Sequence, residues 1–151
     1  MKPRKIVLPS IHKATEDPNS LRIIVNGEDT GGKMSILEQT YFHGETVLPH
    51  NHTRESHLVE VLHGSFRFDF PDSSIEMSAR ELVNIPDGLW HGFTALQKVN
   101  ILRVYIYPAG LEELFLKLQN DSGKSKLRVD ELISQYGTER DPNVRLGKRK
   151  Y

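Results

Sequence analysis

Three histidines stand close together in one segment of the chain, at His50, His52 and His57, among residues that are typical of a β-strand. Side chains two positions apart in a strand project from the same face, about 7 Å apart along the chain. The imidazole rings of His50 and His52 can therefore converge on one cation above that face. Because a protein needs three or four donors to hold a divalent transition metal, this pair indicates a metal site only together with further ligands.

The spacing of the same segment resembles the first signature of the cupin superfamily, which reads Gly, five residues, His-x-His, four residues, Glu, six residues, Gly. The two glycines and the two histidines match, at Gly44, His50, His52 and Gly64. The Glu position is occupied by His57. The resemblance implies a jelly-roll β-barrel whose metal ligands point into the barrel.

A second cupin signature is similar to residues 80–95. It reads Gly, five residues, Pro-x-Gly, two residues, His, three residues, Asn. The proline, the second glycine and the histidine match, at Pro86, Gly88 and His91. Arg80 replaces the first Gly, and Ala95 replaces the Asn. The match indicates that His91 is brought to the metal from a distant part of the sequence.

The resemblance implies one divalent transition metal. Its ligand positions are then all histidines, at His50, His52, His57 and His91. His57 could be a ligand that replaces carboxylate by imidazole, or a residue that lost the ligand role with the carboxylate. Glu60, a nearby carboxylate, has the opposite strand parity to His57, and Glu55 lies two residues too early. Nitrogen ligands suit iron, nickel, copper or zinc and disfavour magnesium and calcium.

Replacing a carboxylate ligand by imidazole changes the charge at a bound metal. Three imidazoles and one carboxylate neutralise one charge of a divalent cation, whereas four imidazoles neutralise none. We therefore expect a stronger Lewis acid that holds anionic oxygen more tightly. The expected partner is a small molecule that chelates the metal through an anionic oxygen, as an enol, a phenol or a carboxylate.

Short segments rich in β-branched and aromatic residues, separated by turn signals, fill most of the first two thirds of the chain. Beyond the histidine segment, strands are expected at 21–25, 34–41, 65–70, 75–78, 81–85 and 99–107, with another beginning near His91. Many short strands with turns between them predict an all-β fold, a jelly-roll barrel over residues 21–110.

The hydrophobic period changes after residue 110. Apolar residues recur at helical spacing in two sets, Leu111, Leu114, Phe115 and Leu118, then Val129, Leu132, Ile133 and Tyr136. We therefore predict two short amphipathic helices within 111–137, which the resemblance places outside the barrel. Residues 1–20 contain three prolines and predict an irregular arm, and 138–151 predict a polar tail that could be disordered.

Strand parity suggests which side chains could wall a substrate pocket, although each could equally be plain core. The candidates are mainly aromatic, namely Phe66, Phe68, Trp90, Phe93 and Tyr105, with Tyr107 and Leu37. If the opposite face of the strand points inward, Arg67 replaces the first two. Arg103 could anchor a substrate carboxylate or pair with an acidic residue on the outer face. His63 could line the cavity or lie at the surface.

Size and composition limit the alternatives. A chain of 151 residues fits one domain with a hydrophobic core. Lys and Arg total 20, as do Asp and Glu, and the charges are mixed, so we expect no nucleic-acid or membrane partner. The chain has no cysteine, which excludes thiolate catalysis and sulfur-ligated metals and allows a cytoplasmic location, the one we expect. No apolar stretch is long enough for a secretory signal or a membrane span.

Three further segments, 27–32, 107–112 and 132–137, look like those of small single-domain cupins that are often described as similar to quercetin 2,3-dioxygenase. The resemblance implies a homodimer and a metal-dependent, dioxygenase-like enzyme acting on an enolisable or phenolic small molecule. The alternative is a non-redox cupin, either a cyclase or isomerase or a binding protein without turnover. Loss of the signature Glu weakens the oxygenase reading, since that residue looks like the general base of quercetinase-like cupins.

Overall fold

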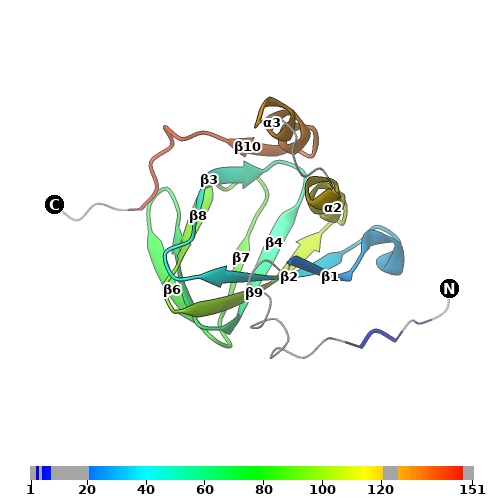
Figure 1. Cartoon of the computed structure of the whole chain (residues 1–151), viewed down its shortest axis with the longest axis horizontal. Helices are drawn as coiled ribbons and strands as arrows, with labels where there is room; N and C mark the ends of the chain where they lie inside the picture. Colours follow the sequence, from blue (N-terminus) through cyan, green and yellow to red (C-terminus); the bar gives the residue numbers. More distant parts are fainter. Residues whose placement is uncertain (1–2, 4, 8–20, 121–125, 148–151) are drawn as a thin grey trace.

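Two antiparallel β-sheets of five strands each face one another in the computed structural model, which describes residues 3, 5–7, 21–120 and 126–147 (Figure 1). The first sheet contains, in spatial order, β1 (Leu21–Val25), β2 (Ser35–Phe42), β9 (Val99–Tyr107), β4 (Ser56–His63) and β7 (Leu82–Ile85). The second sheet contains β10 (Thr138–Arg140), β3 (Thr46–His52), β8 (His91–Ala95), β5 (Ser65–Asp69) and β6 (Ser74–Ser78). A short 3₁₀ helix, η1 (Gly27–Thr30), joins β1 to β2.

Neighbouring strands within a sheet are mostly distant in the sequence, because the chain crosses repeatedly from one sheet to the other. In the first sheet β9 pairs with both β2 and β4, and in the second sheet β8 pairs with both β3 and β5. This is a jelly-roll arrangement. The prediction of an all-β fold is confirmed, and the strands expected at 21–25 and 99–107 coincide with β1 and β9.

Side chains from the inner faces of the two sheets form the main hydrophobic core. Phe66 and Phe68 on β5 are completely buried and pack with Val61 of β4 and Leu102 of β9. Burying an aromatic or aliphatic side chain of this size contributes roughly 1.5–3 kcal/mol. The core therefore fixes the separation of the two sheets, and with it the positions of the strands that carry the histidines.

Two helices follow β9, namely α2 (Glu112–Asn120) and α3 (Lys126–Gln135), as the change of period predicts. The apolar stripe of α2 packs on Leu37 and Ile106 of the first sheet. In Figure 1, α2 lies between the ends of β10 and β1, the outer strands of the two sheets, and α3 lies against β10. The helices thus cover this edge of the sandwich. Neither helix, over its described residues, combines the length and apolar character needed to span a membrane.

The segment predicted as a polar tail, 138–151, is partly a strand. Thr138–Arg140 form β10, which pairs antiparallel with β3. Gly137 has a φ of 80°, in the left-handed region that favours glycine, and it lets the chain turn back after α3. Strand pairing uses backbone groups, so polar side chains do not prevent it at a sheet edge. Most of the predicted arm over 1–20, and residues 148–151, lie outside the described residues.

Candidate metal centre

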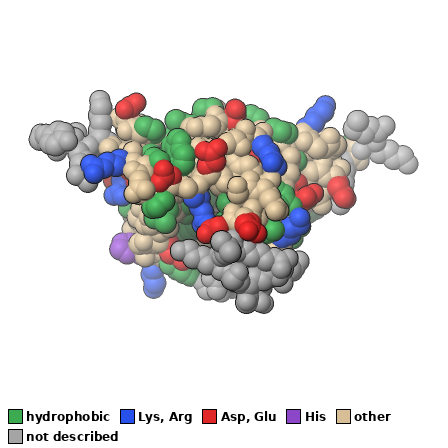
Figure 2. All heavy atoms as spheres, turned by 90° about the horizontal axis from the view of Figure 1, so that it is seen from above, with side chains coloured by type: hydrophobic (Ala, Val, Ile, Leu, Met, Phe, Trp, Pro, Cys, Tyr) green, Lys and Arg blue, Asp and Glu red, His purple; other side chains and the backbone are tan. Residues whose placement is uncertain are grey.

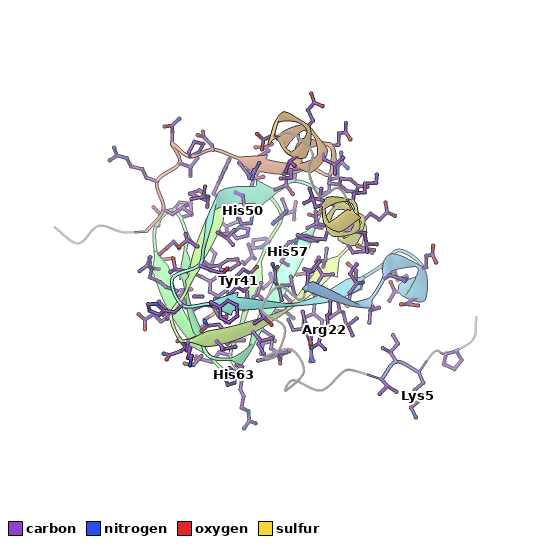
Figure 3. The ribbon with its side chains drawn as sticks, in the orientation of Figure 1. Lys5, Arg22, Tyr41, His50, His57 and His63 are labelled. Carbon is purple, nitrogen blue, oxygen red and sulfur yellow. The ribbon has the colours of Figure 1, made fainter. Side chains whose placement is uncertain are left out.

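Strands of both sheets carry the histidines that the sequence singles out. His50 and His52 lie on β3, and His91 begins β8, where it is the register partner of His50. His57 lies on β4 of the facing sheet. All four side chains are buried, and Figure 3 shows His50 and His57 pointing into the space between the sheets.

The structure brings the four rings into one contiguous group. The ring centroid of His50 lies 4.3 Å from that of His91 and 4.9 Å from that of His52. His57 stacks on His52, with centroids 4.1 Å apart. One ring nitrogen from each of His50, His52 and His91 lies within 4.8 Å of the other two. One cation can reach three nitrogens at this spacing with small adjustments of the side chains.

Backbone carbonyls determine which nitrogen of two rings is free. Nδ1 of His50 lies 2.8 Å from the carbonyl oxygen of Leu48, and Nδ1 of His91 lies 2.8 Å from that of Leu89. Because a carbonyl only accepts, each Nδ1 carries the proton and donates it, and each Nε2 keeps a lone pair. Metal-binding histidines usually make such a second hydrogen bond, which fixes the orientation of the ring.

His52 has two partners at its Nδ1. Oγ1 of Thr138 in β10 lies 3.1 Å away in a hydrogen bond, and Oε1 of Glu55 lies 3.3 Å away in a polar contact that lacks hydrogen-bond alignment. A carboxylate only accepts, so it favours a proton on Nδ1 and leaves Nε2 of His52 with its lone pair. Sequence reasoning missed both partners, because one lies in the supposed tail and the other was set aside on its spacing.

His57 belongs to a second group of donors. His52, Glu55 and His57 each offer an atom within 4.8 Å of the other two, whereas the group around His50 and His91 does not include His57. Nε2 of His57 lies 3.7 Å from Oε1 of Glu55, and both atoms are buried without a hydrogen-bond partner in the described part of the chain. The geometry therefore gives three imidazoles to the first group, where the resemblance implied four, and places His57 beside a carboxylate.

The alternation of side chains along a strand does not apply to Glu55, because Glu55 is not in a strand. It lies in the loop between β3 and β4, where side chains do not alternate, and its carboxylate turns inward with 5% of the residue exposed. The negative charge that the signature loses at His57 is thus present two residues earlier. The expectation of a more Lewis-acidic metal stays a prediction, and Glu55 is a charge that would oppose it.

Burial keeps the imidazoles neutral. It lowers the pKa of His50 from 6.5 to about 4 and that of His91 to about 3, and it also lowers the pKa of His52 and of His57. Burial alone would raise the pKa of Glu55, but its polar contacts with His52 and His57 outweigh this effect and lower the pKa to about 2. Neutral imidazoles beside a carboxylate are the forms that bind transition metals, so these residues fit such an ion.

The histidines form part of the wall of a cavity of about 490 Å³, a volume suited to a small molecule. Both sheets and both helices contribute to the lining, which is mostly apolar. It includes Leu37 and Tyr41 of β2, Phe68 of β5, Phe93 of β8, and Leu114 and Phe115 of α2. The helices therefore do more than lie outside the barrel, since they complete the wall of the cavity.

Only some of the residues predicted to wall a pocket lie at the cavity of the histidines. Phe68 and Phe93 line the cavity. Phe66 does not line it and packs in the core behind them, with its ring centroid 5.8 Å from that of Phe93. Trp90 lines a separate hollow beside β10 and α3. The alternative with Arg67 facing inward is excluded, since that side chain is exposed and pairs with a neighbouring aspartate.

Tyr105 and Arg103 also lie away from the cavity, on the outer face of the first sheet. The hydroxyl of Tyr105 donates to Oε1 of Glu60 at 3.0 Å. The guanidinium of Arg103 donates to Oε1 of Glu38, from Nε at 3.0 Å and from Nη2 at 2.6 Å. Of the two roles considered for Arg103, pairing with an acidic residue is therefore the one observed. His63 is exposed at the end of β4.

No protein-family model and no curated protein sequence matches the chain, whereas many solved structures do. KdgF from Halomonas sp. is 17% identical with a TM-score of 0.56, over 62% of this chain and 81% of its own. The polyketide cyclase RemF from Streptomyces resistomycificus is 23% identical with a TM-score of 0.52, over 58% and 63%. A cupin-2 domain protein from Shewanella frigidimarina is 17% identical with a TM-score of 0.53, over 65% and 92%. At these identities the similarity concerns the fold alone, and this chain has the cupin fold.

Proposed function

We propose that the protein is a metal-dependent enzyme of the dioxygenase-like cupin type that acts on an enolisable or phenolic small molecule. One observation carries the proposal: three buried imidazoles, each with its Nδ1 already engaged, converge at the wall of a largely apolar cavity. His50, His52 and His91 would hold iron, nickel, copper or zinc. Such an ion, when bound, supplies a Lewis acid for an anionic oxygen and, if redox-active, chemistry with O₂.

The other cavity residues suit a planar ligand that carries oxygen atoms. Phe68 and Phe93 present aromatic surface beside the histidines and exclude water. On the facing sheet the hydroxyl of Tyr41 donates to Oε1 of Gln39 at 2.7 Å. Burial raises the pKa of Tyr41, so its hydroxyl stays protonated. Together these two side chains provide a polar edge against which a substrate oxygen can be positioned.

Glu55 and His57 form the candidate proton acceptor. The low pKa of Glu55 makes that carboxylate a weak base, but it remains charged and 3.7 Å from Nε2 of His57. If the imidazole of His57 takes up a proton from substrate, the resulting cation would be stabilised by the adjacent carboxylate. The pair could thereby perform the task of the Glu that is missing from the signature.

A non-redox cyclase is the second candidate. It is favoured by the fold similarity to RemF, a polyketide cyclase, and by a donor set that also suits redox-inert zinc. Both candidates need the same substrate property, an oxygen that becomes anionic on binding. The dioxygenase proposal rests on the imidazole cluster and the aromatic wall, since the similar structures include a polyketide cyclase and a predicted oxalate decarboxylase.

Metal analysis of the purified protein, combined with oxygen uptake on flavonols and β-diketones, separates the two candidates. A redox-active metal at one ion per chain, with O₂ consumed in proportion to substrate, supports the dioxygenase. Zinc with substrate turnover that is unchanged without O₂ supports the cyclase. If the protein neither retains nor binds a transition metal, both candidates are refuted.

A further inference from the structure

Arg140 brings a permanent positive charge to the cavity. It lies on β10 as the register partner of His50, between two hollows. It lines the cavity of the histidines, and it also lines the separate hollow of Trp90, where Asp130, Glu139 and Asp141 lie. Among the described residues that line the cavity of the histidines, no other lysine or arginine is present, and none is Asp or Glu. The cavity thus combines an apolar body with one cationic position next to the histidine cluster.

The present partner of Arg140 is a carboxylate that a ligand could replace. The guanidinium pairs with Asp130 on α3, and the two side chains are 44% and 45% exposed. Exposed ion pairs of this kind contribute little stability, because water solvates both partners well. On the face seen from above in Figure 2, acidic and basic side chains are mixed with apolar ones, so no broad positive field competes with this local charge.

We propose that Arg140 anchors an anionic group of the ligand, whose apolar body lies in the cavity against α2 and α3. A guanidinium offers two parallel N–H donors and matches carboxylate or sulfonate geometry. The ligand class is therefore an apolar, ring-sized molecule with one acidic group at the cavity mouth. Only the further assignment, that an enol or phenol oxygen of this molecule faces the histidines, rests on the proposed function.

Two dyes with the same body test the anchor. Anilinonaphthalene sulfonate carries one negative charge, whereas N-phenyl-1-naphthylamine is neutral, and the fluorescence of both rises in an apolar site. Sulfonate is a weak ligand for transition metals, so binding to the whole 151-residue chain as purified reports on Arg140 whether or not the histidines hold an ion. We expect saturable binding of one sulfonate dye per chain, about tenfold tighter than the neutral dye, which corresponds to one charge-assisted contact.

Substitutions at the ion pair decide the outcome. Arg140→Gln should lower the affinity for the sulfonate dye about tenfold and leave the affinity for the neutral dye unchanged. Asp130→Asn should raise the affinity for the sulfonate dye severalfold, because it removes the competing carboxylate. Arg67→Gln is the matched control, because Arg67 also pairs with an aspartate and is 47% exposed, but it lies outside the cavity. Unchanged thermal midpoints show that each variant is folded. Equal affinity for both dyes, or equal loss in the Arg67 and Arg140 variants, overturns the proposal.

Discussion

Replacing Glu55 by Gln keeps the shape of the side chain and removes its charge. The carboxylate oxygen lies 3.3 Å from Nδ1 of His52 and 3.7 Å from Nε2 of His57, and the residue is 5% exposed. Removing a partner that orients a metal-binding histidine typically costs about 10–100-fold in metal affinity. Because Glu55 contacts two rings in a poorly solvated site, we expect a loss in the upper half of this range, about 2–3 kcal/mol.

The assay is competition for zinc against a chromophoric chelator at pH 7, with the affinity of each variant compared with that of the unmodified protein. Thr138→Val removes the hydrogen-bond partner of His52 and should have a smaller effect, since a neutral hydroxyl interacts less strongly with an imidazole than a charged carboxylate does. Glu60→Gln is the control, because Glu60 lies on the outer face of β4 and accepts from Tyr105. If Glu55→Gln and Glu60→Gln both bind zinc within about twofold of the unmodified protein, Glu55 does not support the metal centre.

Three further predictions follow from the same geometry. His91→Ala should lower zinc affinity by more than about 100-fold, because it removes one of the three ligands. His57→Ala should lower it by less than about tenfold, because His57 lies outside the group of three; equal losses would show that four imidazoles bind. The metal-free protein should lose stability as the pH falls from 6.5 to about 4, because the unfolded chain then binds protons that buried His50 and His91 do not bind in the folded state. His50 alone accounts for roughly 3 kcal/mol, so the loss measured in urea titrations should exceed this value, and a flat profile contradicts it. Leu114→Ala, at a residue on the buried face of α2 that is 3% exposed, should cost about 2–4 kcal/mol of unfolding free energy, whereas exposed Leu116→Ala on the same helix should change it little.

Local patterns in the sequence were sufficient for much of the fold. Alternation placed Phe66 and Phe68 on one face of their strand, the face that is buried, and the change to helical spacing after residue 110 located α2 and α3. Such patterns succeed because each strand or helix must bury one face wherever it packs. They failed for β10, whose formation depends on the free edge of β3, a feature of another segment of the chain.

The sequence by itself indicated that His50 and His52 can share one cation, through their spacing in a strand, and its resemblance to the second cupin signature added His91. Only the tertiary structure decided how those donors are supported and what surrounds them. It turned Glu55 inward from a loop, brought Thr138 to His52 across a strand pair, and placed Arg140 at the cavity. The physical reason is that spacing along a strand sets the direction of a side chain, whereas contacts between loops, sheet edges and helices depend on how distant segments pack.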